Sequence, residues 1–219
     1  MINFDLIISI LPQLAQGALI TLAIAFCSSL IGFIGGTILG VIQTSGYRGL
    51  SFAVALYATI LRGTPMLLQI VFLSLMLPTI GIYLSAFTTA VIAIGLNSSA
   101  YISQIIRSGI QSVSKGQIEA ARTLGISSGD ITRYIVLPQA LRVVIPALGN
   151  EFITLIKDSS LASIIGVMEL YMRGNIIISQ TYNSLSVYVA TGLFYLVMTV
   201  ILSLIVHRIE KKLNYHARN

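Results

Sequence analysis

Long apolar runs, separated by short polar links, make up most of the chain. Several of these runs match the stretch of about 20 residues that a helix needs to cross the hydrocarbon core of a bilayer. So much apolar sequence cannot be buried in the core of one soluble domain. Membrane-spanning helices accommodate it, because each helix satisfies its own backbone hydrogen bonds. We therefore predict an all-α integral membrane protein in which residues 1–219 form one transmembrane domain. The five predicted spans cover about residues 14–42, 51–77, 82–107, 143–168 and 187–206.

The second apolar run is interrupted near its middle by Arg62, Gly63, Thr64 and Pro65. A proline removes a backbone donor and a glycine loosens the helix, so we predict a break at residues 62–65. An arginine at membrane depth costs about 2.5 to 3.5 kcal/mol and should face protein or a wet cavity. Two interpretations remain open. In the first, the break is a kink that a buried arginine contact holds in place. In the second, a half-helix starts at the break, with Thr64 as its cap and Pro65 as its first residue. The free N–H groups of that half-helix would suit an anionic group of the substrate.

Small and polar residues mark two further runs. In the first, Gly32, Gly36 and Gly40 recur at four-residue spacing, which predicts that another helix packs closely against this face in lipid. In the third, Asn97 and Ser98 interrupt an otherwise apolar helix. An asparagine in hydrocarbon needs hydrogen-bond partners, and either a neighbouring helix or a ligand supplies them. The sequence leaves both possibilities open.

Residues 108–142 form the longest polar segment. Its first half favours a short helix with Gly125 as the C-cap, and a second helical stretch is predicted to begin at Ser128 and to end near Pro138. We interpret the segment as a helix–turn–helix outside the membrane. The alternative is an ordinary amphipathic surface loop. A further polar link is predicted over residues 169–186.

Charge is scarce and unevenly placed. Of the 219 residues, 56% are hydrophobic and 9% are charged, against about 25% charged in soluble domains. The net charge of +6 would suggest nucleic acid in a soluble protein, but here the cations set orientation, so no nucleic-acid partner is expected. With five spans, one side holds Arg48, Arg107, Lys115, Arg122, Arg133, Arg142, Arg208, Lys211, Lys212 and Arg218. The other side has Arg173, so the N-terminus is predicted outside, and the polar segment and the C-terminus in the cytoplasm.

Two other features narrow the class of protein. Cys27 is the single cysteine, which excludes an intrachain disulfide and a zinc set built on cysteines. The N-terminus carries Asp5 and lacks the basic region of a cleaved signal peptide, so it is interpreted as an uncleaved tail. No metal or cofactor site is predicted in the chain.

Four motifs are spread along the chain: Arg62-Gly63-Thr64-Pro65, Glu119-Ala120-Ala121 followed by Gly125, Leu137-Pro138-Gln139-Ala140, and Lys157-Asp158-Ser159-Ser160-Leu161. Together with five spans, they resemble the permease subunits of bacterial polar amino acid importers of the type I ABC class, the family of histidine, arginine and glutamine permeases. The resemblance implies a multi-pass permease of the bacterial inner membrane that dimerises with itself or with a paralogue. It also implies two copies of a cytoplasmic ABC ATPase, which bind the ATP and magnesium, and an extracytoplasmic amino-acid-binding protein.

The resemblance also implies a role for the polar segment. Glu119, Ala120, Ala121 and Gly125 would belong to a coupling helix that docks into the ATPase. Closure of the two ATPases on ATP would then rock the spans between inward-open and outward-open arrangements. The permease itself needs no catalytic residue, so the chain is predicted to be a transport subunit and not an enzyme.

Two acids in the fourth run are the candidate substrate residues. Glu151 and Asp158 are seven positions apart, so on a helix they differ by about 20° in direction and lie roughly 10 Å apart along the axis. Carboxylates at membrane depth need a cationic partner, which is Lys157, Arg62 or the cargo. We predict that the acids bind the two cationic ends of a basic amino acid such as arginine, lysine or histidine. Asn97, Ser98 and Thr64 would complete the pocket from neighbouring spans.

Three rival functions remain open from the sequence. A permease for neutral polar amino acids, such as glutamine or cystine, would use Glu151 only for structure. An integral membrane enzyme would use Glu151 and Asp158 as acid and base, but His207 and His216 lie at the predicted cytoplasmic end and no nucleophile–histidine set is evident. A channel-forming bundle would conduct passively without ATP.

Overall fold

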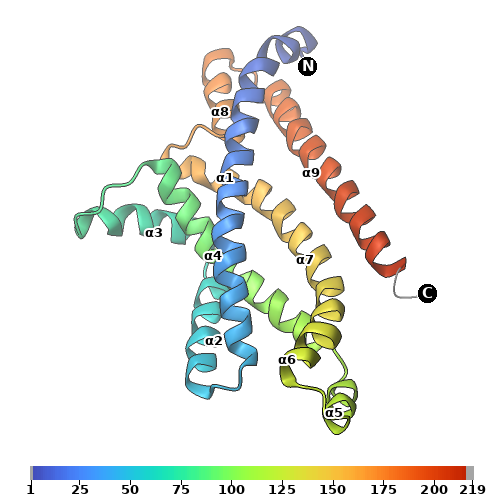
Figure 1. Ribbon diagram of the computed structural model, residues 1–219. Coiled ribbons are helices and arrows are strands. Elements are labelled where there is room, and N and C mark those ends of the chain that lie inside the picture. The colour runs from blue at the N-terminus through green and yellow to red at the C-terminus, as the bar shows by residue number, and fades with distance from the viewer. Residues whose placement is uncertain (1, 216–219) are drawn as a thin grey trace.

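The structure is a computed structural model that describes residues 2–215, and its regular elements are helices (Figure 1). They are α1 (Phe4–Thr44), α2 (Arg48–Gly63), α3 (Met66–Thr79), α4 (Ala86–Gln111), α5 (Lys115–Thr123), α6 (Ser128–Asp130), η1 (Ile131–Val136), α7 (Leu137–Asp158), η2 (Ser159–Ile165), α8 (Leu170–Thr181) and α9 (Ser184–Tyr215). Within the described residues, four helical stretches are long and apolar enough to cross a membrane, or five if α2 and α3 count as one broken span. The predicted all-α membrane fold is confirmed. His216 and Arg218 lie outside the described residues.

Helices α1 and α4 pack together more extensively than any other pair of described elements. A Cβ atom added to Gly36 would lie 2.6 Å from Cβ of Ile102, and one added to Gly40 would lie 2.7 Å from Cβ of Ile106. Both distances are shorter than a van der Waals contact, so only glycine permits this approach of the two helices. The close packing predicted from Gly32, Gly36 and Gly40 is confirmed.

The first helix begins well before the predicted start of its span, at Phe4. Asn3 caps it, since its Oδ1 accepts a hydrogen bond from the N–H of Leu6 at 3.0 Å. The N–H of Asn3 also donates to Oγ of Ser186 at 2.9 Å, which joins the helix start to α9. Pro12 lies inside the helix without ending it. The segment interpreted as an N-terminal tail is therefore largely helical.

The polar link predicted over residues 169–186 contains a short helix, α8, which was not predicted. Glu169 begins this helix as its N-cap, and its carboxylate accepts hydrogen bonds from the N–H groups of Tyr171 and Met172, both at 2.8 Å. The hydroxyl of Tyr195 on α9 donates to the same carboxylate at 2.9 Å. Burial raises the pKa of Glu169 above its ordinary value, while the hydrogen bonds to the carboxylate lower it in part. A single buried acid therefore joins α8 to α9.

Replacing Glu169 with alanine is expected to lower the stability of the chain by about 2–3 kcal/mol, because a helix cap is lost and buried donors lose their acceptor. Glu169 is 0% exposed, so water does not replace the carboxylate. Thermal unfolding of the detergent-purified protein measures the loss. Glu169→Gln keeps the size and one acceptor oxygen, so it should lose less. Equal midpoints for the alanine variant and the wild type would contradict this role.

The break predicted in the second span is confirmed, with α2 and α3 meeting at 104°. Thr64 has extended backbone, with φ −116° and ψ 145°, as expected for a residue before proline. It is the C-cap of α2, and its hydroxyl donates to the carbonyl of Ile60 at 2.9 Å. Pro65 is the N-cap of α3, and no side chain caps that end. The half-helix therefore begins one residue later than predicted, so Thr64 is not its cap.

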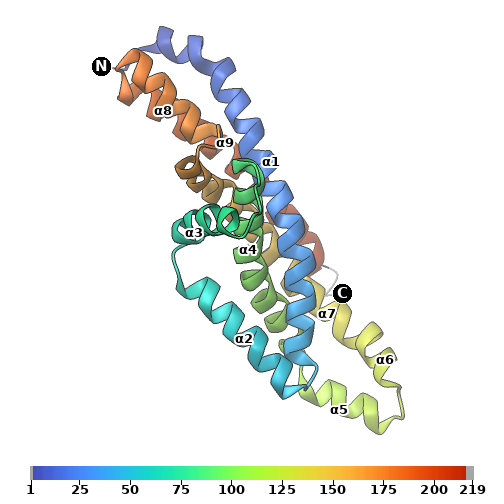
Figure 2. The ribbon, with the colours of Figure 1, turned by 90° about the vertical axis from the view of Figure 1, so that its left-hand side faces the viewer.

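The polar segment lies at the end of the molecule opposite the N-terminus and α8 (Figures 1 and 2). Within it, α5 ends with Leu124 as C-cap and then Gly125, which has φ +75°. The N–H of Gly125 donates to the carbonyl of Arg122 at 2.9 Å, and the N–H of Ile126 donates to the carbonyl of Ala121 at 3.1 Å. This pair of hydrogen bonds is a Schellman motif. The helix end predicted at the glycine is confirmed.

The predicted helix end near Pro138 is wrong. Helix α6, the π-helical turn η1 and α7 follow one another without a gap, and η2 extends the candidate span to Ile165. Pro138 lies in the first turn of α7, directly after the π-helical turn. A proline is tolerated at the start of a helical segment, and a π-helical turn shifts the hydrogen bonds by one residue. One continuous helical path therefore leads from the polar segment into the membrane.

Candidate functional site

A polar pocket lies where the break between α2 and α3 faces α4 and α7. Its volume is about 210 Å³. The lining residues are Thr64, Met66, Asn97, Tyr101, Glu151, Thr154 and Asp158. Four of the five predicted substrate residues therefore come together in one cavity, although they are distant in sequence. The fifth, Ser98, contacts a residue of the lining.

Helix α7 places the two acids on one face, as predicted. Glu151, Thr154 and Asp158 have the spacing at which helical side chains stand above one another. On the α4 side, Oγ of Ser98 donates a hydrogen bond to Oε1 of Glu151 at 2.9 Å. Ser98 is fully buried, and Gly32 of α1 leaves the space that it occupies. The close packing of α1 and α4 therefore positions the hydroxyl that holds Glu151.

Glu151 also borders a second cavity of about 220 Å³ between α1, α4 and α7. The other residues around that cavity are Ser29, Leu30, Phe33, Ile102, Leu148, Phe152 and Leu155. Apart from Ser29, these side chains are apolar. The carboxylate of Glu151 thus lies at the boundary between the polar pocket and apolar surroundings.

Asn97 and Gln69 tie the broken helix to α4. Nδ2 of Asn97 donates to the carbonyl of Leu61 and to Oε1 of Gln69, both at 3.0 Å. Nε2 of Gln69 donates to the same carbonyl at 2.7 Å and to Oγ1 of Thr64 at 2.8 Å. The carbonyl of Leu61 needs these donors because Pro65, four residues on, has no N–H. Neighbouring helices therefore supply the partners of Asn97 in this structure.

Neither acid of the pocket forms an ion pair with a described side chain. Lys157 is exposed. The guanidinium carbon of Arg62 lies 5.1 Å from the centre of the Tyr101 ring, over its face. The pairings that the sequence offered, with Lys157 or with Arg62, are therefore not formed. Neither acid has an ion-pair partner within 4.0 Å among the described side chains, and Lys157 acts on Asp158 only electrostatically, over a longer distance.

Several residues of this site were missed in the sequence. Tyr101 lies four positions after Asn97, and Thr154 lies between the two acids, so the helical period would have indicated both. Gln69 lies four positions after Pro65, on the first turn of the half-helix. Its role depends on the carbonyl of Leu61, which Pro65 leaves without an N–H partner, so the proline was the signal that a donor was needed. Met66 likewise enters the pocket only because of the bend.

The predicted coupling residues lie on α5 and its C-terminal turn. Glu119 and Ala120 are exposed, whereas Ala121 is 4% exposed and packs inward. Nε2 of Gln139 on α7 donates to Oε1 of Gln117 on α5 at 2.7 Å. The outer face of α5 is therefore free within the described chain, and its inner face is attached to α7.

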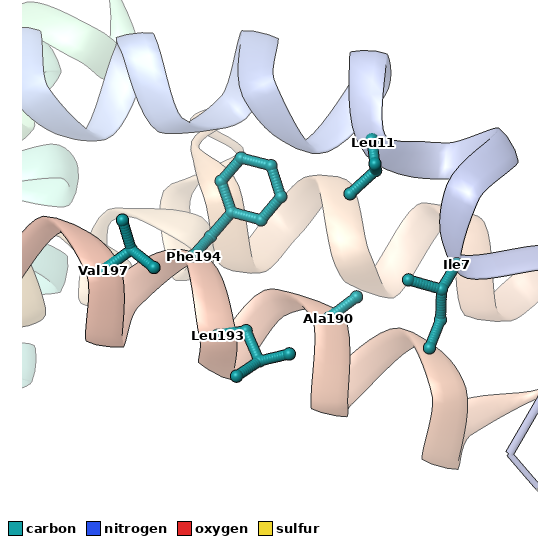
Figure 3. A pocket seen from close by; sticks show the side chains of 6 residues that line it. All are labelled: Ile7, Leu11, Ala190, Leu193, Phe194 and Val197. Atoms are coloured by element: carbon teal, nitrogen blue, oxygen red, sulfur yellow. The ribbon is translucent and has the colours of Figure 1, made fainter. Parts of the chain in front are cut away.

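A further cavity, of about 240 Å³, lies between the N-terminal parts of α1 and α9 (Figure 3). It is lined by Ile7, Leu11, Ala190, Leu193, Phe194 and Val197. These side chains contain no hydrogen-bond donor or acceptor, so they offer nothing to orient a polar ligand. The polar pocket is therefore the candidate site.

Known proteins with similar sequences are transport permeases. Residues 32–215 match the family described as binding-protein-dependent transport system inner membrane component. An arginine transport system permease protein of Bacillus subtilis (strain 168) is 38% identical over 213 residues, which cover 97% of each chain. A glutamine transport system permease protein of Escherichia coli (strain K12) is 37% identical over 209 residues, which cover 93% of this chain and 94% of that one.

Solved structures agree with these sequence matches. A chain in the crystal structure of an amino acid ABC transporter with histidines is 35% identical, and superposes with a TM-score of 0.91 over 97% of this chain and 99% of that one. A chain of an inward-facing methionine ABC transporter has a TM-score of 0.77 at 22% identity over 94% and 98% of the two chains, which shows the shared fold. The chain therefore belongs to the family of binding-protein-dependent transport system inner membrane components, as a permease of the polar amino acid ABC transporter type.

Proposed function

We propose that this permease carries basic amino acids, such as arginine, lysine and histidine, through the polar pocket. The observation that carries the proposal is that Glu151 and Asp158 line one cavity and form no ion pair with the described side chains. Carboxylates at membrane depth require a counter-charge. A basic amino acid brings two positive groups, its α-ammonium and its side-chain cation. One acid would bind each of them.

The other predicted residues fit a supporting role. Thr64 and Asn97 line the same cavity, and both are hydrogen-bonded to Gln69. These hydrogen bonds fix the position of the broken helix where it lines the pocket. Ser98 donates to Glu151 and orients that carboxylate. We infer that these three residues shape the site and that the two acids make the charged contacts with the cargo.

Replacing Glu151 with glutamine is expected to raise the concentration of L-arginine needed for half-maximal stimulation of ATP hydrolysis by about tenfold or more. The variant keeps the shape and the hydrogen bond with Ser98 but removes a charge, and a hydrogen bond to a charged group contributes about 1.5–3 kcal/mol. The measurement is ATPase activity of the complete transporter, with its binding protein, in proteoliposomes.

Glu210→Gln is the matched control, because it makes the same chemical change at an exposed site near the end of α9. It should respond to arginine as the wild type does. An undiminished response of Glu151→Gln to arginine, lysine and histidine would contradict the assignment of Glu151 as a cargo contact.

A permease for neutral polar amino acids is the second candidate. It is favoured by the hydrogen bond from Ser98, which gives Glu151 a structural partner, and by the 37% identity to the glutamine permease protein of Escherichia coli. Stimulation by a panel that includes glutamine and cystine separates the two candidates. Stimulation by neutral amino acids alone would favour this second function.

Family membership makes the chain a multi-pass transport subunit of the inner membrane and implies an ATPase and a binding protein as partners. Membership of this family argues against the two rival functions of an integral membrane enzyme and a passive channel. We propose that two ATPase copies bind the ATP and magnesium and that a second permease chain, identical or paralogous, completes the complex. No resident cofactor and no nucleic-acid partner is proposed.

The coupling role of the polar segment belongs to the same proposal. Its predicted docking residues are Glu119, Ala120, Ala121 and Gly125. In the proposed orientation the N-terminus lies outside, and α5 and the C-terminus lie in the cytoplasm. The placement of α5 and the N-terminus at opposite ends of the molecule supports this orientation (Figures 1 and 2).

A further inference from the structure

Arg62 lies beside the polar pocket without an acidic partner among the described side chains. It belongs to the last turn of α2, directly before the break. Its guanidinium is held over the ring of Tyr101, 5.1 Å from the ring centre. Tyr101 itself lines the pocket, together with Thr64, which follows Arg62 by two residues. A positive charge therefore lies against one lining residue of a cavity that is also lined by two acids.

An arginine in a membrane span is expected to face protein or a wet cavity and to have a partner there. The aromatic face of Tyr101 is a partial partner, since a cation–π contact attracts the guanidinium. Among the described residues the guanidinium of Arg62 donates no hydrogen bond, so its N–H groups are available. Those N–H groups match a carboxylate, which binds arginine through two parallel hydrogen bonds.

We propose that Arg62, held over Tyr101, binds the α-carboxylate of the amino acid cargo and thereby selects amino acids over amines of the same side-chain charge. The inference rests on the proposed function and extends it. Glu151 and Asp158 recognise positive groups, so by themselves they would accept any diamine. A cationic group beside the same pocket makes the site complementary to a molecule that carries both signs of charge.

The test compares L-arginine with agmatine, which has the same guanidinium and amine but no carboxylate. Equilibrium binding of each is measured on the purified permease–ATPase complex in lipid nanodiscs, without the binding protein, so that only the membrane site selects. The wild type should bind arginine more tightly than agmatine. Arg62→Ala should weaken arginine binding by about tenfold or more, as expected for loss of a charge-assisted hydrogen bond, and leave agmatine binding unchanged.

Two variants sharpen the comparison. Arg62→Lys keeps the charge but loses the planar pair of donors, so it should retain part of the preference for arginine. Arg48→Ala removes the exposed arginine in the first turn of the same helix and should leave both affinities unchanged. If Arg62→Ala weakened the binding of arginine and of agmatine equally, Arg62 would only support the structure of the pocket. That result would overturn the inference and leave the proposed function intact.

Binding to the wild-type complex tests the proposed substrate class independently of Arg62. If the wild-type complex binds L-glutamine and not L-arginine, the basic specificity fails. The same comparison is then made between L-glutamine and 4-aminobutanamide, its counterpart without the carboxylate. If Arg62→Ala weakened the binding of glutamine alone, the result would still support the carboxylate contact. Equal weakening of the binding of both ligands would overturn it.

Discussion

Leucine in place of Gly36 is expected to abolish assembly of the transporter in the membrane. A Cβ atom at this position would lie 2.6 Å from Cβ of Ile102 and 2.8 Å from the carbonyl oxygen of Ser99. Backbone atoms of α4 cannot move aside as the end of a flexible side chain does, so the two helices must separate. Overpacking a core costs about 1–3 kcal/mol, occasionally more, and here it opens the most extensive helix contact of the described chain.

The measurement is the amount of permease that co-purifies with the ATPase from membranes, together with amino acid uptake. Gly36→Ala should give an intermediate loss, because it adds one carbon at the same contact. Gly49→Leu is the control, since a Cβ added to Gly49 has no neighbour within 4 Å. Wild-type yield and uptake for Gly36→Leu would contradict the described packing of α1 against α4.

Valine in place of Gly125 is expected to uncouple ATP hydrolysis from uptake: uptake falls to background while the complex still assembles and hydrolyses ATP. Gly125 has φ +75°, and a left-handed conformation costs roughly 1–2 kcal/mol for a residue with a Cβ. No atom lies within 4 Å of an added Cβ, so the strain is local to the turn after α5. The Schellman hydrogen bonds would then be lost, and the outer face of α5 would be presented at a different angle.

Uptake and ATP hydrolysis are measured in the same proteoliposomes. Gly125→Asn is the matched control, because asparagine tolerates the left-handed conformation better than valine does and also ends helices in this way. It should keep most of the coupling. Normal uptake per ATP hydrolysed in Gly125→Val would argue against a coupling role for this turn.

The features that the sequence predicted correctly are local. The spacing of Gly32, Gly36 and Gly40 indicated the close packing of α1, and proline with glycine indicated the break at residues 62–65. The helical period placed Glu151 and Asp158 on one face. In each case the residues that carry the signal are neighbours in the chain, so no knowledge of the tertiary fold was required.

Two features that the sequence analysis missed depend on partners far along the chain. Glu169 begins a helix that looked like a polar link, because its buried carboxylate is satisfied partly by Tyr195 on another helix. The position of Arg62 depends on Tyr101, which lies on α4. Such contacts form only after the helices have come together.

The π-helical turn at Ile131–Val136 joins the polar segment to the helix that carries both acids. A π-helical turn contains more residues per turn than an α-helix, and one residue of an α-helix corresponds to about 100° of rotation about its axis. If these six residues adopted α-helical hydrogen bonds, α7 would turn by roughly that angle relative to α5. A change of backbone register at one end of the molecule would then rotate Glu151 and Asp158 away from the pocket together, with no bend in the helix between them.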